Sequence, residues 1–251
     1  HSIDAIRHFA KEYEKVYFII GADQVALFDK WYKPDEIASL AQIVYVSRPG
    51  NEISDSNVSR FHMIKLEMDE YPVSSTQIRN LESIDYPDEI RHYVETKRLY
   101  QMSKLGEYLK PKRLDHSISV ANVALKIAIN NPEAALPIEA YRAGLLHDLG
   151  KYVNEEAAKA MIKENFDEKF INYPSWAYHQ WTGAVIARDE FGERNQKILD
   201  AITYHCTGRP KMGPLEQIIY SSDKIDPLRG YDSSGRKGHR QNMAAYSFKS
   251  Q

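Results

Sequence analysis

AYRAGLLHDLGKYV, residues 140–153, carries an adjacent His147-Asp148 pair at the end of an apolar helical pattern rich in small residues. Neighbouring residues on a helix point about 100° apart, so two such polar side chains rarely both serve packing. Further imidazoles and carboxylates accompany other helical patterns along the chain: His116, His179, His205 and Asp223. Ligands of this kind, spread over several helices, are what a transition-metal site in a helical bundle requires.

Each of these histidines taken singly is more simply explained as a capped or solvent-facing imidazole. Taken together, these residues instead favour a functional site, because two of them lie in a matching local sequence pattern. Arg113 and His116 share a helix face at i, i+3, and Asp223 is followed by Asp226 on one face. The pattern therefore predicts a metal-dependent phosphohydrolase centre. Cys206 is beside His205, but a lone thiol is more often a small buried hydrophobe than a ligand.

Composition limits the class of protein. The 251 residues are 43% hydrophobic and 27% charged, an ordinary globular balance that suits one large or two medium domains. No stretch approaches a membrane span and no signal-peptide pattern is visible. The single cysteine excludes an internal disulfide framework and favours the cytoplasm. A net charge of −2 without a basic stripe argues against nucleic acid, which leaves a small molecule as the expected partner.

The first hundred residues alternate between helical and strand patterns. Residues 1–13 predict an amphipathic helix, and Val16–Ile20 is a short apolar run typical of a central parallel strand. A second helix is expected over 34–40, a second buried strand over 43–47, and a third strand within 61–68. This alternation predicts an α/β layer with a parallel sheet.

Two features of this half could bind a nucleotide. Ser74, Ser75 and Thr76 stand at a predicted helix start and are followed by Arg79. Free backbone N–H groups, hydroxyls and a cation there would make a phosphate site, although an ordinary helix cap is commoner. Trp31-Tyr32 fits packing as well as stacking on a base.

Five motifs in this half occur in a recognisable order: IIGAD (19–23), KWYK (30–33), SRPG (47–50), SSTQIR (74–79) and YPDEIRHYVETKRLY (86–100). They resemble the C-terminal part of nicotinate-nucleotide adenylyltransferase, which has a Rossmann-like nucleotidyltransferase fold. The resemblance implies one role for each of these residues: Asp23 at the nucleotide site, Trp31 and Tyr32 near the nicotinate ring, Arg48 near the substrate, Ser75 and Arg79 on ATP phosphates. The catalytic glycine-rich segment of that family would precede residue 1, so adenylyl transfer would require an upstream segment.

Residues 99–112, with Gly106 and Pro111 as breakers, mark the expected boundary. Helical patterns alone follow it, and they begin near Arg113, Pro137, residue 155, His179, residue 195 and Pro214. We expect an α/β portion over 1–103, an all-α bundle over 104–234, and a flexible or discontinuous tail over 235–251.

The helical half also has motifs in a specific order: Arg113-x-x-His116, LLHDLGK (145–151), H-x-x-x-G-A (179–184), AITYHCTGRPKM (201–212) and SDKIDPLRGYD (222–232). They resemble the HD-superfamily symmetrical bis(5'-nucleosyl)-tetraphosphatases, which split diadenosine tetraphosphate into two ADP. That family has Glu where this chain has Asp226.

The second resemblance implies an iron centre, or one of manganese or another divalent transition metal, with one or two ions. Its ligands would be His116, His147, Asp148 and Asp223, and His179 and His205 would complete a second metal position or bind phosphate. Lys151, Arg209 and Arg229 would meet substrate phosphates, and Asp148, Lys151 and Arg209 would be catalytic.

Three alternatives stay open at this point. The same site could act on nucleotide monophosphates, the two halves could form a bifunctional enzyme if an upstream segment exists, or the chain could be a non-catalytic nucleotide sensor. A homodimer is compatible with all of them.

Overall fold

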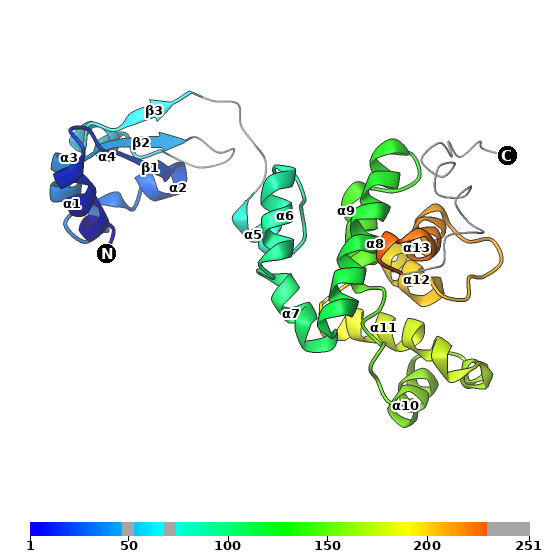
Figure 1. The fold of residues 1–251 in the computed structure, drawn as a ribbon. Coiled ribbons are helices and arrows are strands. Elements are labelled where there is room, and N and C mark those ends of the chain that lie inside the picture. The colour runs from blue at the N-terminus through cyan, green and yellow to red at the C-terminus, as the bar shows by residue number, and fades with distance from the viewer. Residues whose placement is uncertain (47–52, 68–73, 230–251) are drawn as a thin grey trace. The chain divides into compact units, whose positions relative to one another are not determined.

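The computed structural model describes residues 1–46, 53–67 and 74–229. Its internal contacts divide the chain into two compact units, residues 1–74 and 75–251 (Figure 1). The first unit is α/β, and the described part of the second is helical, as the sequence predicts. Arg48 and the predicted tail 235–251 lie outside the described residues.

The first unit is built on a parallel sheet of order β1-β2-β3. Its elements, in chain order, are α1 (Ser2–Glu12), β1 (Tyr17–Gly21), α2 (Ala22–Val25), a 3-10 turn η1 (Phe28–Lys30), α3 (Pro34–Leu40), β2 (Gln42–Val46), α4 (Asp55–Arg60) and β3 (Ile64–Leu66). Side chains alternate across a strand, so Ile20, Ile43 and Tyr45 point to the face where they join Ile3 and Ile37 in one core.

The other face of this sheet is apolar and exposed. Tyr17, Ile19, Ile64 and Leu66 share it by register and are exposed by 61, 62, 51 and 42% respectively. Parallel sheets ordinarily have both faces covered. The described helices of this unit therefore pack only one side of the sheet.

The second unit is all-helical over its described residues. Its helices are α5 (Ser75–Arg79), α6 (Asp88–Thr96), α7 (Gln101–Tyr108), α8 (Pro111–Asn130), α9 (Pro137–Leu146), α10 (Glu155–Asn165), α11 (Tyr178–Asp189), α12 (Gln196–Tyr204) and α13 (Pro214–Ile225), with 3-10 turns η2 (Glu168–Asn172), η3 (Ser175–Ala177) and η4 (Pro227–Arg229). Pro111, Pro137 and Pro214 each stand in the first helical turn, where the missing N–H costs nothing.

Helices α8 and α9 pack closely through small residues. A Cβ on Gly144 would lie 2.5 Å from Cα of Ala121, so only glycine permits this approach of the two backbones. Leu125 and Leu145 fill the adjoining core. The close packing holds the C-terminal end of α9, where the His-Asp pair follows, against α8.

Residues 75–103 pack with the helical unit. Val94, Met102 and Leu105 belong to the same buried cluster as Leu114 and Leu125. The contact boundary thus precedes residue 103, and helix α7 runs through Gly106, where a break was expected. The division at 103/104 stays a prediction about family relationship, while the packing division falls near Ser74.

Two smaller points concern helix ends and membranes. Gly192 and Gly208 follow the ends of α11 and α12 and have φ of +66° and +69°, a conformation that favours glycine. No helix in the described part of the chain is both long and apolar enough to cross a membrane.

Candidate metal centre

The His-Asp pair lies at the end of α9 and is deeply buried. His147 is fully buried and Asp148 is 2% exposed. The Nδ1 of His147 is 2.7 Å from the carbonyl oxygen of Gly144, one turn earlier, so this nitrogen donates the hydrogen bond. That bond turns Nε2 toward the interior, where it has no hydrogen-bond partner among the described residues. A buried imidazole nitrogen in this state is the form that binds a cation.

One ligand group brings together α8, α9 and α13. The Nε2 of His116 lies 3.2 Å from Asp223 Oδ1, and the Nε2 of His147 lies 3.9 Å from the same oxygen. His147 Nε2 is also 3.5 Å from Asp148 Oδ2. All four residues are at most 5% exposed. The ligand atoms of His116, His147 and Asp223 lie within 4.8 Å of one another, closely enough to hold one ion.

A second ligand group is formed by α11 and the end of α12. The Nε2 atoms of His179 and His205 lie 3.1 Å apart. The Nδ1 atoms donate to the carbonyls of Trp176 and Ile202, at 2.7 and 2.8 Å. In that tautomer both Nε2 atoms present lone pairs to each other, which is unfavourable unless they share a cation. The histidine pair thus fits a metal ion.

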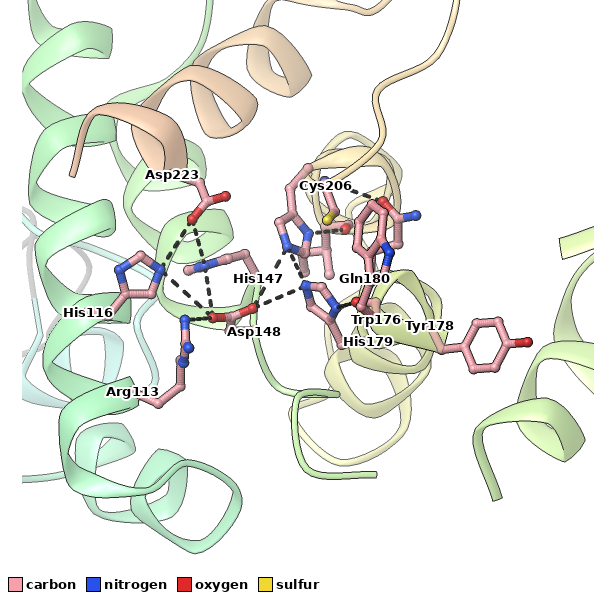
Figure 2. A network of polar contacts seen from close by, with 12 residues as sticks. Arg113, His116, His147, Asp148, Trp176, Tyr178, His179, Gln180, Cys206 and Asp223 are labelled. Atoms are coloured by element: carbon pink, nitrogen blue, oxygen red, sulfur yellow. Dashed lines mark hydrogen bonds and ion pairs between the residues drawn. The ribbon is translucent and has the colours of Figure 1, made fainter. Parts of the chain in front are cut away.

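Asp148 joins the two groups. Its Oδ2 faces the first group, and its Oδ1 lies 3.3 Å from His179 Nε2 and 3.8 Å from His205 Nε2. Figure 2 shows the carboxylate between His116 and His179. Arg113 donates to Oδ2 at 2.9 Å. Each oxygen of Asp148 would therefore help to hold a cation in a different group, and the six candidate ligands come from five helices or helix ends.

Electrostatics keep Asp148, His179 and His205 in the forms that bind a metal. Burial disfavours the charged form of Asp148, but the imidazoles of His147, His205 and His179 hold its pKa well below the usual range. Burial lowers the pKa of His179 to about 4 and that of His205 well below its usual value. Both imidazoles are therefore neutral near pH 7, with a lone pair for a metal.

A carboxylate stands behind His116. Asp226 is fully buried, its Oδ2 lies 2.6 Å from His116 Nδ1, and Ser119 donates to its Oδ1. Burial opposes the charged form of His116, but its hydrogen bonds to Asp223 and Asp226 raise its pKa. The shorter side chain at the position where the family has Glu thus still reaches the imidazole. Such partners fix the tautomer and orientation of a ligand.

The predicted phosphate-binding cations have different surroundings. Arg209 pairs with Asp200 and Glu216, at 2.8 Å each, and its guanidinium lies over the Tyr204 ring. Lys151 follows directly in the turn after Asp148 and is half-buried, and Arg229 is the last residue of η4. Contacts of all three with a substrate stay predictions.

The ammonium group of Lys224 also lies beside the candidate ligands, and the sequence pattern did not indicate it. Its Nζ lies 3.3 Å from Asp223 Oδ2, on the carboxylate whose Oδ1 faces the ligand group, and its side chain is 34% exposed. Its position directly after a ligand was the available signal. Arg113 was noted only for its spacing from His116.

The predicted adenylyltransferase-like residues lie in both units. In the first unit, Asp23 follows β1 at the start of α2, the end of a parallel sheet where ligands bind in α/β folds. Trp31 and Tyr32 line a pocket of about 200 Å³. In the second unit, Ser75 begins α5, and Arg79 donates to Thr76. Their roles remain predictions.

Comparison with known proteins supports the family resemblance of both the α/β and the helical part of the chain. A model of the HD domain matches residues 113–228, and one described as cytidylyltransferase-like matches residues 2–81. The chain thus joins a nucleotidyltransferase-like region to a helical phosphohydrolase region that depends on a divalent metal. Through this helical region it belongs to the HD domain family.

Three similar proteins illustrate the range. A Mycoplasma pneumoniae protein named probable nicotinate-nucleotide adenylyltransferase/Ap4A hydrolase is 27% identical to this chain. The match covers 92% of this chain and 67% of that protein. The symmetrical bis(5'-nucleosyl)-tetraphosphatase of Bacillus subtilis is 32% identical over 50% of this chain and 67% of its own length. A crystal structure from Clostridium acetobutylicum, described as a predicted HD superfamily hydrolase involved in NAD metabolism, has a TM-score of 0.51 and 30% identity. The match covers 57% of this chain and 74% of that one.

Proposed function

We propose that the HD unit hydrolyses symmetrical dinucleoside tetraphosphates, with diadenosine tetraphosphate giving two ADP. The observation that carries this proposal is the pair of ligand groups joined by Asp148, with cations beside it. The likeness to the Bacillus subtilis tetraphosphatase supports the choice of substrate. The choice of iron, or of manganese in its place, rests on the histidine-rich donor set.

The residues of the candidate site have complementary tasks. His116, His147, Asp148 and Asp223 would hold one ion, and His179, His205 and the other oxygen of Asp148 a second. Bound divalent ions supply a water of lowered pKa and neutralise phosphate charge. Asp148 additionally orients the attacking water. The water oxygen forms a bond to one central phosphorus and its proton passes to solvent. The bond from that phosphorus to the bridging oxygen breaks, so that one ADP departs as an anion and the second ADP carries the oxygen of the water.

Cations beside the ligands stabilise the charge that develops on the departing phosphate. Arg113 has a side chain 29% exposed and touches Asp148, and Lys224 touches Asp223. Lys151 follows Asp148 in the same turn. ADP is already a good leaving group, so charge neutralisation matters more than protonation of its oxygen.

The test is a product analysis. The full chain, loaded with Fe(II) or Mn(II), is incubated with diadenosine tetraphosphate, and the nucleotides are separated by chromatography. We expect ADP as the sole product. Formation of AMP and ATP would refute symmetrical cleavage. With AMP as substrate in a parallel incubation, faster release of phosphate than cleavage of diadenosine tetraphosphate would support a phosphomonoesterase. Full hydrolysis by metal-free protein would refute the metal centre.

A second activity, adenylyl transfer to nicotinate mononucleotide, is favoured by the likeness to the Mycoplasma pneumoniae protein and by the Trp31-Tyr32 pocket. The intact gene product is incubated with nicotinate mononucleotide and ATP, and the release of pyrophosphate is followed. Absence of pyrophosphate release from that product would exclude this activity.

A further inference from the structure

Trp176 stands out beside the metal centre. It is in η3, three residues before His179, and its carbonyl oxygen accepts the Nδ1 hydrogen bond of that histidine. The residue is 62% exposed although indole is one of the largest apolar side chains. Figure 2 shows it on the His179 side of Asp148, opposite Arg113 and His116.

The neighbouring aromatic side chains behave differently. Phe170, Tyr173 and Tyr178 gather around the buried ring of Trp181, with centroids at 4.8, 5.2 and 6.4 Å. Among the described residues, no aromatic ring makes a comparable contact with Trp176. The segment thus packs its other rings around Trp181, with Tyr173 still 43% exposed, and leaves one indole outside this cluster.

The backbone that carries Trp176 is well anchored. Ala177 is fully buried, and its N–H donates to the carbonyl of Pro174 at 2.9 Å. The hydroxyl of Tyr178 donates to the carbonyl of Ile171 at 2.5 Å. The backbone that carries the exposed ring is fixed before a ligand arrives, which reduces the entropy lost on binding.

We infer that Trp176 is a nucleobase-binding residue, on which one base of the substrate stacks while its phosphates lie at the metal centre. The inference rests on the proposed function, because it requires a substrate with phosphates at that centre. A ribose and one phosphate separate the nearer base from the phosphorus that is attacked, so this base lies beyond the ligand residues. Stacking on indole accepts any base, since every base has a π face.

The test compares a ligand that carries a nucleoside with one that has only the two phosphates. Binding of ADP and of inorganic pyrophosphate to the Mn(II)-loaded full chain is measured by calorimetry. Binding that disappears in His147→Ala is assigned to the metal centre, which separates it from nucleotide bound by the first unit. Trp176→Ala should weaken this ADP binding by about 10-fold, as expected for one base–aromatic stack, and leave pyrophosphate binding unchanged.

Two further variants serve as controls. Trp176→Phe keeps a stacking face and should restore most of the ADP affinity. Tyr93→Ala removes another exposed ring, 55% exposed on α6, and should have no effect. Equal ADP affinity in wild type and Trp176→Ala, equal loss of ADP and pyrophosphate, or no ADP binding at the centre would each overturn the inference. Because no turnover is measured, a failure to hydrolyse diadenosine tetraphosphate would refute the proposed reaction without affecting this result.

Discussion

Replacement of Asp226 by Asn tests the metal centre without touching a ligand. The carboxylate is fully buried and accepts hydrogen bonds from His116 Nδ1, at 2.6 Å, and from Ser119. Asparagine has nearly the same shape but no charge. The Nδ1–H group of His116 can still donate a hydrogen bond to the amide oxygen, but this bond loses its ionic component. As a result, Nε2 becomes a weaker and less well oriented metal ligand.

The size of the effect follows from this geometry. A hydrogen bond to a charged group contributes about 1.5–3 kcal/mol, and a carboxylate behind a metal-binding imidazole typically changes metal affinity about 10–100-fold, or roughly 1.4–2.7 kcal/mol. We therefore expect Asp226→Asn to raise the dissociation constant of the ion held by His116 by about 10–100-fold. At saturating metal the hydrolysis rate should largely recover.

The assay is a titration of metal-stripped protein with Mn(II), followed by calorimetry or by the EPR signal of free Mn(II). Asp115→Asn is a matched control, because Asp115 is adjacent to His116 but pairs with Arg98 and has a side chain 48% exposed. Ser119→Ala removes a neutral donor and should have a smaller effect, about 1 kcal/mol. Wild-type affinity in Asp226→Asn would refute the orienting role.

Three other substitutions follow from the structure. His147→Ala should remove bound metal and hydrolysis while circular dichroism shows intact helix content, and an active, metal-loaded variant would contradict the site. Gly144→Ala places a Cβ 2.5 Å from Cα of Ala121 and should lower the free energy of unfolding, measured in urea, by about 1–3 kcal/mol. Gly106→Ala is the control, because the nearest atom to its new Cβ lies at 3.9 Å, and it should not lower the free energy of unfolding. Equal stability of the two variants would argue against the close packing of α8 and α9. Lys224→Met should lower kcat/KM for diadenosine tetraphosphate by about 10-fold and weaken its dependence on salt, and an unchanged kcat/KM would show that the ammonium does not meet the substrate.

The regular elements follow closely from sequence pattern. Expected helices and strands coincide with α1, β1, α3 and β2 in the first unit within one or two residues, and with α8 onward in the second. Helix α4 was not predicted, because it shows no apolar period. It is held by tertiary contacts instead: Asn57 is buried and donates to the carbonyl of Val25 at 2.9 Å. Packing of this kind has no local sequence signal.

The boundary between the units shows the same limit. Residues 86–100 resemble the adenylyltransferase family, which placed them with the first half. Val94 and Met102 nevertheless pack into the helical core. A family motif reports descent, whereas the contact partner of an apolar side chain is decided by the surfaces available in three dimensions.

From sequence alone, the chain specifies an α/β portion followed by a helical bundle, and the types and order of the candidate metal ligands. These properties are local, because periodicity, helix breakers and the donor chemistry of His and Asp do not depend on distant contacts. Only the tertiary structure decides how the ligands are shared. The Oδ2 of Asp148 faces His147 and its Oδ1 faces His179, and Asp226 lies behind His116, 110 positions away in the chain. Such groupings depend on how α8, α9, α11 and α13 pack, which no stretch of sequence encodes by itself.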